Sequence, residues 1–336
     1  MADNAFLDLD RVRRSGRKAV LATVVRADGP SYRRPGASAV IAEDGEVVGA
    51  ISAGCLDADI GENALQVIAG GPPRLLHYNT GSPEDLLYGT GSGCGGSIQV
   101  LVAPVADDLL DRLLARLAKG ESVTLETVVE PGPDLGRRQL AAEGSPGASA
   151  VPAPSVATSA PGASLFGQVI TPPITLLICG AGDDARPLAQ FASAAGFRVV
   201  VCDHRPAWPS PERFPTADHT VICDCTALPT QIQLPAGSYA VLLSHQFERD
   251  LAHLEALLER DLAYIGLLGA RDRSARLISQ LLTARPDLYQ AVRDKLHAPV
   301  GLDIGADGPF EIALSIAAEL VAHRAGRPGA PLSEVR

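Results

Sequence analysis

The spacing of apolar and polar residues predicts an α+β domain over residues 1–130. Residues 5–18 and 107–119 have the spacing of amphipathic helices, and a third helix is expected to open at residues 52–55. Apolar runs typical of strands separate these helices, and they lie at 19–25, 38–42, 47–51, 74–79, 97–102 and 123–129. The polar sequence EDGE at 43–46 predicts a hairpin between two of these strands.

The second half of the chain has a different pattern. Residues 131–164 are rich in Pro, Gly, Ala and Ser, which is typical of a flexible linker without a core of its own. Residues 165–336 alternate predicted strands and helices. The strands lie at 175–179, 198–202, 220–223, 239–244 and 263–268, and the helices at 184–195, 247–259, 274–283 and 310–323. Such alternation indicates a doubly wound parallel sheet, a Rossmann-like C-terminal domain of the α/β class.

Charge and composition exclude several classes of function. The 336 residues carry a net charge of −10, which argues against nucleic acid and anionic membrane surfaces as partners, because both need a basic face. No apolar stretch reaches the roughly 18 residues of a membrane span, and residues 1–10 do not resemble a signal peptide. We therefore expect a cytoplasmic protein, with its six cysteines as free thiols.

The sequence GAGDDA at residues 180–185 matches the GxGxxA turn of dinucleotide-binding domains. It lies between a predicted strand and a predicted helix, where Gly180 and Gly182 would let the backbone approach a pyrophosphate. Asp203 ends the following strand, at the position of the acid that binds a ribose hydroxyl. On this interpretation the domain would hold NAD(P).

Two features of the same region favour a different ligand, or none. Asp183 and Asp184 would stand where the phosphates lie, at a cost of about 1 kcal/mol each even in water. They suit the helix itself, because acids in the first turn stabilise the helix dipole. His204 and Arg205 follow Asp203 and favour an anion over a bare ribose. The motif predicts the fold and leaves the ligand open.

The sequence GPSYRRPG at residues 29–36 predicts an anion-binding loop in the N-terminal domain. Its two prolines and two glycines fix the backbone around Ser31, and Arg33 and Arg34 supply planar donors suited to phosphate or carboxylate. Paired arginines also occur as ordinary solvated surface, so both interpretations stay open.

Two cysteines lie in segments that can expose backbone N–H groups. Cys55 follows Gly54 at a predicted helix N-terminus, which would favour the thiolate, although a buried packing role is as consistent with the sequence. Cys94 lies in GTGSGCGGS at 89–97, where the backbone can form an anion-binding nest or admit a flat ring, or is merely a flexible loop. The glycines around Cys94 include Gly91, Gly93 and Gly95.

Taken together, these motifs resemble the XdhC/CoxI family, the accessory proteins of xanthine dehydrogenase and related molybdenum hydroxylases. The resemblance covers both domains and leaves out only the linker. It rests on several long motifs in one order: GPSYRRPGA at 29–37, GAISAGCLD at 49–57, GSGCGG at 91–96, the turn from Gly180, SH at 244–245, YIGLLGAR at 264–271 and HAPVGLDIGA at 297–306.

The resemblance implies a maturation chaperone rather than an enzyme. Its cargo would be molybdenum cofactor, as molybdopterin or its cytosine dinucleotide, protected during sulfuration by a cysteine desulfurase and then handed to an apoenzyme. That partner would be a molybdoenzyme of the xanthine dehydrogenase, aldehyde oxidase or carbon monoxide dehydrogenase type. Whether the chain forms a homodimer stays open.

This cargo assigns roles to the candidate residues. The arginines and glycine N–H groups suit its phosphate, and Cys55 or Cys94 would contact molybdenum or its labile sulfido group. His245 and Arg271 follow predicted strands of the C-terminal domain, whose carboxyl ends form the ligand-binding edge of an open sheet. Many family members carry His after the second Rossmann glycine, whereas this chain has Asp183, so a ligand role for that His does not transfer.

The alternative function is an NAD(P)-dependent oxidoreductase. It requires Gly180, Gly182 and Asp203 to hold the dinucleotide, with His245 or a similar group as proton donor. The sequence has no Tyr-x-x-x-Lys motif and no evident His/Asp dyad, so this function ranks below the chaperone.

Overall fold

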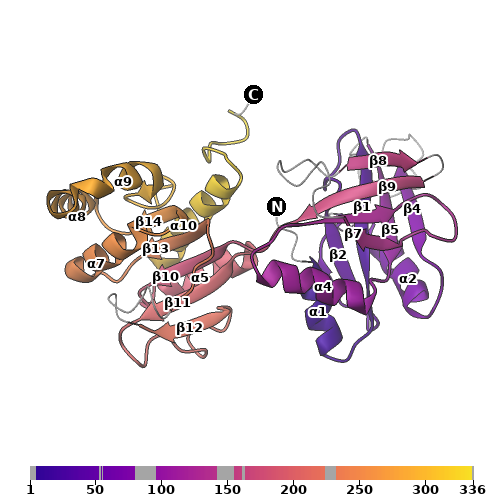
Figure 1. The fold of residues 1–336 in the computed structure, drawn as a ribbon, viewed down its shortest axis with the longest axis horizontal. Helices are drawn as coiled ribbons and strands as arrows, with labels where there is room; N and C mark the ends of the chain where they lie inside the picture. Colours follow the sequence, from indigo (N-terminus) through magenta and orange to yellow (C-terminus); the bar gives the residue numbers. More distant parts are fainter. Residues whose placement is uncertain are drawn as a thin grey trace. The chain divides into compact units, whose positions relative to one another are not determined.

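The computed structural model describes residues 5–52, 54, 56–79, 96–141, 155–160, 163–223 and 232–334. The chain divides into two compact units, residues 2–172 and 173–336 (Figure 1). Each unit has its own sheets and its own apolar core.

A five-stranded antiparallel sheet with the order β3-β2-β1-β5-β4 forms the centre of the N-terminal unit. Its strands are β1 (Ala19–Asp28), β2 (Ser38–Ala42), β3 (Val47–Gly49), β4 (Arg74–Asn79) and β5 (Ser97–Ala103). Helix α2 (Asp57–Ile68) packs Ile60, Ala64 and Val67 against one face. Helices α1 (Ala5–Arg14) and α4 (Asp107–Ala118) pack against the other face. Because both faces are covered, β2 is buried throughout its length, and all of its residues except Ser38 are apolar.

A second antiparallel sheet, with the order β7-β6-β9-β8, belongs to the same unit. Its strands are β6 (Val123–Val128), β7 (Arg138–Leu140), β8 (Ser155–Ala160) and β9 (Ala163–Ile170). The sequence predicts a flexible linker at 131–164, but β7 and β8 lie within that range. Strand β9 extends across residue 165, where the second domain was expected to begin. The physical reason is long-range: β9 pairs along the whole of β6 and buries Phe166 beside Leu101 and Val129.

The C-terminal unit is built on a six-stranded parallel sheet with the order β12-β11-β10-β13-β14-β15. The strands are β10 (Thr175–Cys179), β11 (Arg198–Asp203), β12 (His219–Ile222), β13 (Ser238–Leu242), β14 (Leu262–Leu267) and β15 (Leu296–His297). Strands β10, β11 and β12 follow one another toward one edge of the sheet, and β13, β14 and β15 follow one another from β10 toward the other edge. This is the topology of a Rossmann fold. The predicted Rossmann-like domain is confirmed.

Helices cover both faces of this parallel sheet (Figure 1). Leu176 and Ile178 of β10 face a core shared with α5 (Ala185–Ala194) and α10 (Pro309–Arg324). Leu177 and Cys179 face the opposite core. The elements that close this second core are α7 (Phe247–Leu258), α8 (Arg271–Ala284), η1 (Pro286–Leu288) and α9 (Tyr289–Lys295). Strands buried on both faces are apolar at successive positions, and these continuous apolar runs are the pattern from which the strands were predicted.

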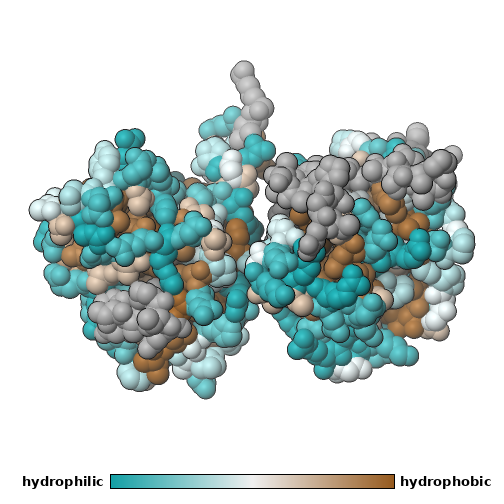
Figure 2. Space-filling model, viewed as in Figure 1, coloured by the Kyte–Doolittle hydropathy of each residue, from teal (hydrophilic) through white to brown (hydrophobic). Residues whose placement is uncertain are grey.

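The surface drawn in Figure 2 is mostly hydrophilic, with apolar side chains in small groups. Within the described ranges, no helix has both the length and the apolar character needed to cross a bilayer. Cys179 and Cys202 are buried free thiols, as the sequence predicts for them, and Cys223 is also buried.

Candidate functional site

The strand ends that flank the N-terminal candidates lie together at one end of the five-stranded sheet. The pairing of Asp28 with Ser97, and of Asn79 with Ser97, places the end of β1, the end of β4 and the start of β5 side by side. Ala39, near the start of β2, pairs with Gly49 at the end of β3. The segments 29–37, 50–56 and 80–96 therefore all begin or end at this edge of the sheet.

Gly96 packs closely against the backbone at the start of the arginine loop, residues 29–36. A Cβ added to Gly96 would lie 2.8 Å from the carbonyl oxygen of Asp28 and would also meet the carbonyl of Pro30. The last glycine of the GSGCGG motif thus lies directly against the first residues of the arginine loop. A side chain of any size would separate the two segments.

Hydrogen bonds to its backbone carbonyls hold the arginine loop in place. The Ser31 hydroxyl donates to the carbonyl of Arg33 at 2.8 Å, and the Ala37 N–H donates to the carbonyl of Arg34 at 3.1 Å. Arg34 is exposed, whereas Arg33 is half-buried and its Nε is buried with no hydrogen-bond partner among the described residues. A buried guanidinium N–H without a partner is costly. An anionic oxygen at this position would remove that cost, so the loop fits a phosphate.

Ser52 organises the residues described just before helix α2, and these contacts are called here the Ser52 turn. The Ser52 Oγ accepts hydrogen bonds from the N–H groups of Gly54 at 3.1 Å and Leu56 at 3.2 Å, and it donates to the carboxylate of Asp57. Helix α2 begins at Asp57, two residues beyond Cys55, rather than at 52–55 as expected. The expectation overlooked a short side-chain-capped turn that precedes the helix.

The predicted sulfur ligands and most of the predicted glycine nest lie outside the described residues. These are Cys55, Gly91, Gly93, Cys94 and Gly95. Among the residues that the structure does describe, no three His, Cys, Asp or Glu side chains gather as metal ligands.

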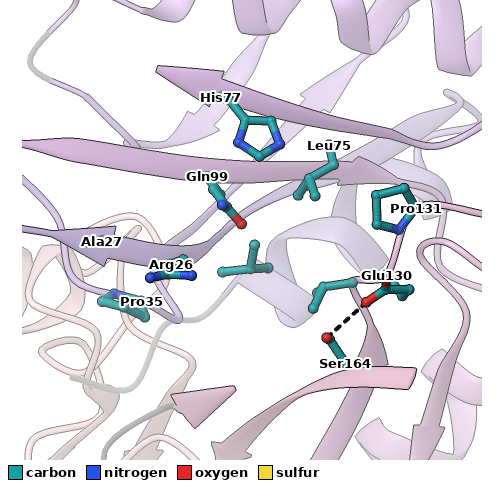
Figure 3. Close-up of a pocket in the computed structure, with 11 residues that line it drawn as sticks. Arg26, Ala27, Pro35, Leu75, His77, Gln99, Glu130, Pro131 and Ser164 are labelled. Carbon is teal, nitrogen blue, oxygen red and sulfur yellow. Dashed lines mark hydrogen bonds between the residues drawn. The ribbon is translucent and has the colours of Figure 1, made fainter. Parts of the chain in front are cut away.

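A groove in the N-terminal unit borders the arginine loop at Pro35 and was not foreseen from the sequence. Its volume is about 550 Å³, within the range of small-molecule sites. Its polar lining comes from Arg26, His77, Gln99, Glu130 and Ser164 (Figure 3). These residues are far apart along the chain, and only the strand register, which the sequence does not reveal, brings them together.

The glycine turn of the C-terminal unit follows β10 as predicted. Gly180 has φ +114°, and a Cβ there would lie 2.7 Å from the Leu243 carbonyl oxygen, so only glycine fits. At Gly182 a Cβ would lie 2.8 Å from Oδ1 of Asp184. The carboxylate of Asp184 therefore stands close to the backbone that a pyrophosphate would approach in a dinucleotide site.

Asp203 is engaged by its own neighbours. Its Oδ2 accepts from the Ala181 N–H at 2.8 Å and from Arg205 Nη2 at 2.7 Å, and its Oδ1 accepts from Arg205 N and Nε, both at 2.9 Å. Burial alone would raise the pKa of Asp203, but the hydrogen bonds from Arg205 and Ala181 lower it to about 2. Arg205 in turn stacks on Trp208, with 3.5 Å from Cζ to the ring centroid. The carboxylate thus binds the glycine turn to the end of β11.

The two aspartates of the turn are also paired. Arg213 Nη2 lies 3.1 Å from Asp183 Oδ1, and His245 Nε2 lies 2.6 Å from Asp184 Oδ2. His245 has φ +58°, an unusual conformation for a residue other than glycine. The sequence shows no evident His/Asp dyad, whereas the structure brings one together across 61 residues.

A buried ion pair supports the same edge of the sheet. Asp250 accepts from the Ser244 hydroxyl at 2.6 Å and from Arg273 Nη2 at 2.6 Å, and its side chain is fully buried. Arg271 begins α8, is exposed, and makes no recorded hydrogen bond with the described residues. His245 and Arg271 thus lie after β13 and β14, at the carboxyl ends where they were predicted.

Two protein-family models match this sequence. The model of the XdhC and CoxI family matches residues 12–79, and the model of the XdhC Rossmann domain matches residues 176–320. The first covers the arginine loop and the Ser52 turn, and the second covers the parallel sheet.

Known proteins match over nearly the whole chain. A protein from Bacillus subtilis, described as a probable subunit of xanthine dehydrogenase, is 31% identical over 94% of this chain and 96% of its own length. The molybdenum cofactor insertion chaperone PaoD from Escherichia coli is 28% identical over 92% of this chain and 85% of its own. A crystal structure of a xanthine dehydrogenase from Bacillus halodurans superposes with a TM-score of 0.76 and 30% identity, over 99% of this chain and 98% of that one.

Proposed function

Since the chain belongs to the XdhC and CoxI family, we propose that it is a maturation chaperone that binds molybdenum cofactor and delivers it to a xanthine dehydrogenase-type molybdenum hydroxylase. PaoD, a molybdenum cofactor insertion chaperone, resembles this chain along most of both sequences and supports the proposal. The handover takes place in the cytoplasm, and a cysteine desulfurase sulfurates the cofactor while the chaperone holds it.

One observation carries the binding part of the proposal: the convergence of the arginine loop, the Ser52 turn and Gly96 at one end of the five-stranded sheet. Arg33 presents a buried guanidinium donor that lacks a protein partner among the described residues. The cofactor carries a phosphate, and a planar guanidinium is well suited to bind it. The residues present therefore fit the phosphate end of this cargo.

In the sequence, Cys55 lies between two residues of the Ser52 turn and Cys94 lies two residues before Gly96. We propose that one of these cysteines contacts molybdenum or its sulfido group. A soft thiolate suits this metal and this sulfur chemistry. Gly91, Gly93 and Gly95 would supply backbone N–H groups to the same cargo.

The experiment is reconstitution in a host that lacks its own family member. An apo-hydroxylase is produced with the wild-type chain, with Cys55→Ala, with Cys94→Ala, or without the chain. We expect the wild-type chain to raise hydroxylase activity at least tenfold and at least one cysteine variant to lower it again. Molybdenum and cyanide-releasable sulfur in the hydroxylase separate delivery from sulfuration. Equal activity with and without the chain would refute the proposed function.

The second candidate, an NAD(P)-dependent oxidoreductase, has one feature in its favour, the His245–Asp184 pair beside the glycine turn. The engagement of Asp203 by Arg205 and Ala181 counts against it, because a ribose would have to displace those hydrogen bonds. Calorimetric titration with NAD⁺ and NADP⁺ distinguishes the two functions. Micromolar binding of either would favour the oxidoreductase, and we expect no heat of binding at millimolar concentration.

A further inference from the structure

The groove bordering Pro35 has a floor built by strand register. Gln99 of β5 pairs with His77 of β4 on one side and with Arg26 of β1 on the other, so the three side chains form a row across the sheet. The register of β1 shifts between Val24 and Arg26, a β-bulge. Bulges re-aim side chains and are frequent beside functional sites, and here Val25 and Arg26 both line the groove.

The two ends of the groove have opposite charge (Figure 3). Arg26 and Pro35 lie at one end, and Glu130 and Ser164 lie at the other. Arg26 Nε binds Asp28 at 2.7 Å, which leaves its Nη groups without a recorded partner in the described part of the chain. The Ser164 hydroxyl donates to Glu130 Oε2 at 2.9 Å, so the carboxylate still has lone pairs on both oxygens.

The middle of the groove is suited to a flat ring. Val25 and Val129 are buried members of one apolar cluster, and Leu75 packs against that cluster. Gln99 lies between the charged ends and makes no recorded side-chain hydrogen bond with the described residues (Figure 3). A ligand that fits is therefore flat and apolar in its body, anionic at one end, and rich in N–H donors at the other.

We propose that this groove binds the pterin ring of the cargo, with the 2-amino and ring N–H edge at Glu130 and the phosphate directed toward Arg26 and the arginine loop. The inference rests on the proposed function and specifies which residues select the cargo. A carboxylate accepts two parallel N–H bonds from an amino-pyrimidinone edge with charge-assisted strength. Gln99 can pair with the polar atoms at the middle of the ring, because its amide both donates and accepts.

The register supports this orientation. Pro35 lines the basic end of the groove and belongs to the arginine loop, so Arg33 is two residues from the groove lining. His77 is two residues before the end of β4, and β4 ends at the same end of the sheet as β1, which leads into the arginine loop. A ligand lying along the groove would thus place its phosphate near Arg33 while its ring reaches Glu130.

Guanine has the same edge of N–H donors, so a guanine nucleotide is the other ligand that this groove could bind. The test uses three probes on the full-length protein under anaerobic conditions: molybdenum cofactor released from a purified molybdoenzyme, 6-hydroxymethylpterin, and GMP. Affinities are measured by calorimetry for the wild type, Glu130→Gln, Gln99→Leu and the control Glu126→Gln. Glu126 lies on β6 outside the groove lining and accepts a hydrogen bond from Gln139. Its replacement by Gln removes the same charge as Glu130→Gln without touching the groove.

We expect Glu130→Gln and Gln99→Leu to weaken binding of the cofactor at least tenfold, and Glu126→Gln to leave it within twofold. Because Glu130 is exposed, its amide variant should melt at the wild-type temperature, which separates lost binding from lost folding. Cofactor binding by Glu130→Gln at wild-type strength would overturn the groove assignment and leave the proposed function standing. No cofactor binding by the wild type would overturn both. Tighter binding of GMP than of the cofactor would assign the groove to guanine nucleotides.

Discussion

Among single residues, Arg33 carries a buried donor that an anionic ligand would complete. Its Nε is buried without a partner among the described residues, although the loop around it is well bonded. Such a group costs free energy unless a ligand completes it. The sequence predicted the arginine loop as an anion site, but two adjacent arginines look alike in a sequence. Only the structure separates half-buried Arg33 from exposed Arg34.

Arg33→Ala is expected to weaken cofactor binding tenfold or more, because it removes a charge-assisted hydrogen bond worth roughly 1.5–3 kcal/mol. Arg112→Ala, which removes an exposed arginine on α4, is the control and should bind within twofold of the wild type. Fluorescence titration with the cofactor measures both variants. Equal affinities would remove Arg33 from the site.

Asp203 contributes stability through its lowered pKa. The pKa of Asp203 is about 2 in the folded state and has an ordinary value of 3.8, so the ionised carboxylate stabilises the fold fully at pH values above 3.8. As the pH falls from 3.8 toward 2, the unfolded chain takes up a proton before the folded one does, and this stabilisation is lost. Asp203→Asn should therefore lower the free energy of unfolding by about 1–2 kcal/mol at pH 7.

The difference between Asp203→Asn and the wild type should shrink as the pH falls from about 4 toward 2. Urea unfolding at a series of pH values, followed by fluorescence, gives this difference directly. A difference that stays constant to pH 2 would show that the carboxylate is not held ionised by Arg205 and Ala181.

At the scale of elements, the sequence predicts strands and helices well where the pattern is local. Five of the six parallel strands of the Rossmann unit are short continuous apolar runs between helices, and these five are found close to their predicted positions. The sixth, β15, is only two residues long and was not predicted. The antiparallel β8 and β9 were missed because their stability comes from pairing with β6, distant in sequence, within a Pro-, Gly- and Ala-rich segment. The groove was missed for a related reason, since strand register joins residues as far apart as Arg26 and Glu130.

The junction of the two loops at Gly96 gives a prediction at this scale. Gly96→Ala should destabilise the N-terminal unit by about 1–3 kcal/mol, because the new Cβ meets the backbone carbonyls of Asp28 and Pro30 rather than a movable side chain. Gly61→Ala, inside α2 with open space around it, is the control and should stabilise by up to about 1 kcal/mol. Urea unfolding measured by circular dichroism tests both. If Gly96→Ala is as stable as the wild type, the loops are not packed together as described.

At the scale of the whole molecule, each unit has its own core, so we expect each to unfold as its own cooperative transition. The single tryptophan, Trp208, belongs to the C-terminal unit and contacts Arg205. Its fluorescence should therefore respond to Asp203→Asn and not to Gly96→Ala, whereas circular dichroism should respond to both. A shift of the tryptophan transition by Gly96→Ala would show that the two units unfold together.

If this chain carries molybdenum cofactor, the cargo can be measured in the purified protein. The full-length protein is purified without oxygen from a host that makes the cofactor, and molybdenum is determined by mass spectrometry and pterin by fluorescence after oxidation. We expect near-stoichiometric amounts of both, reduced severalfold in Arg33→Ala and in Glu130→Gln. Folded wild-type protein that contains neither molybdenum nor pterin, from a host shown to be replete with the cofactor, would refute the proposed cargo.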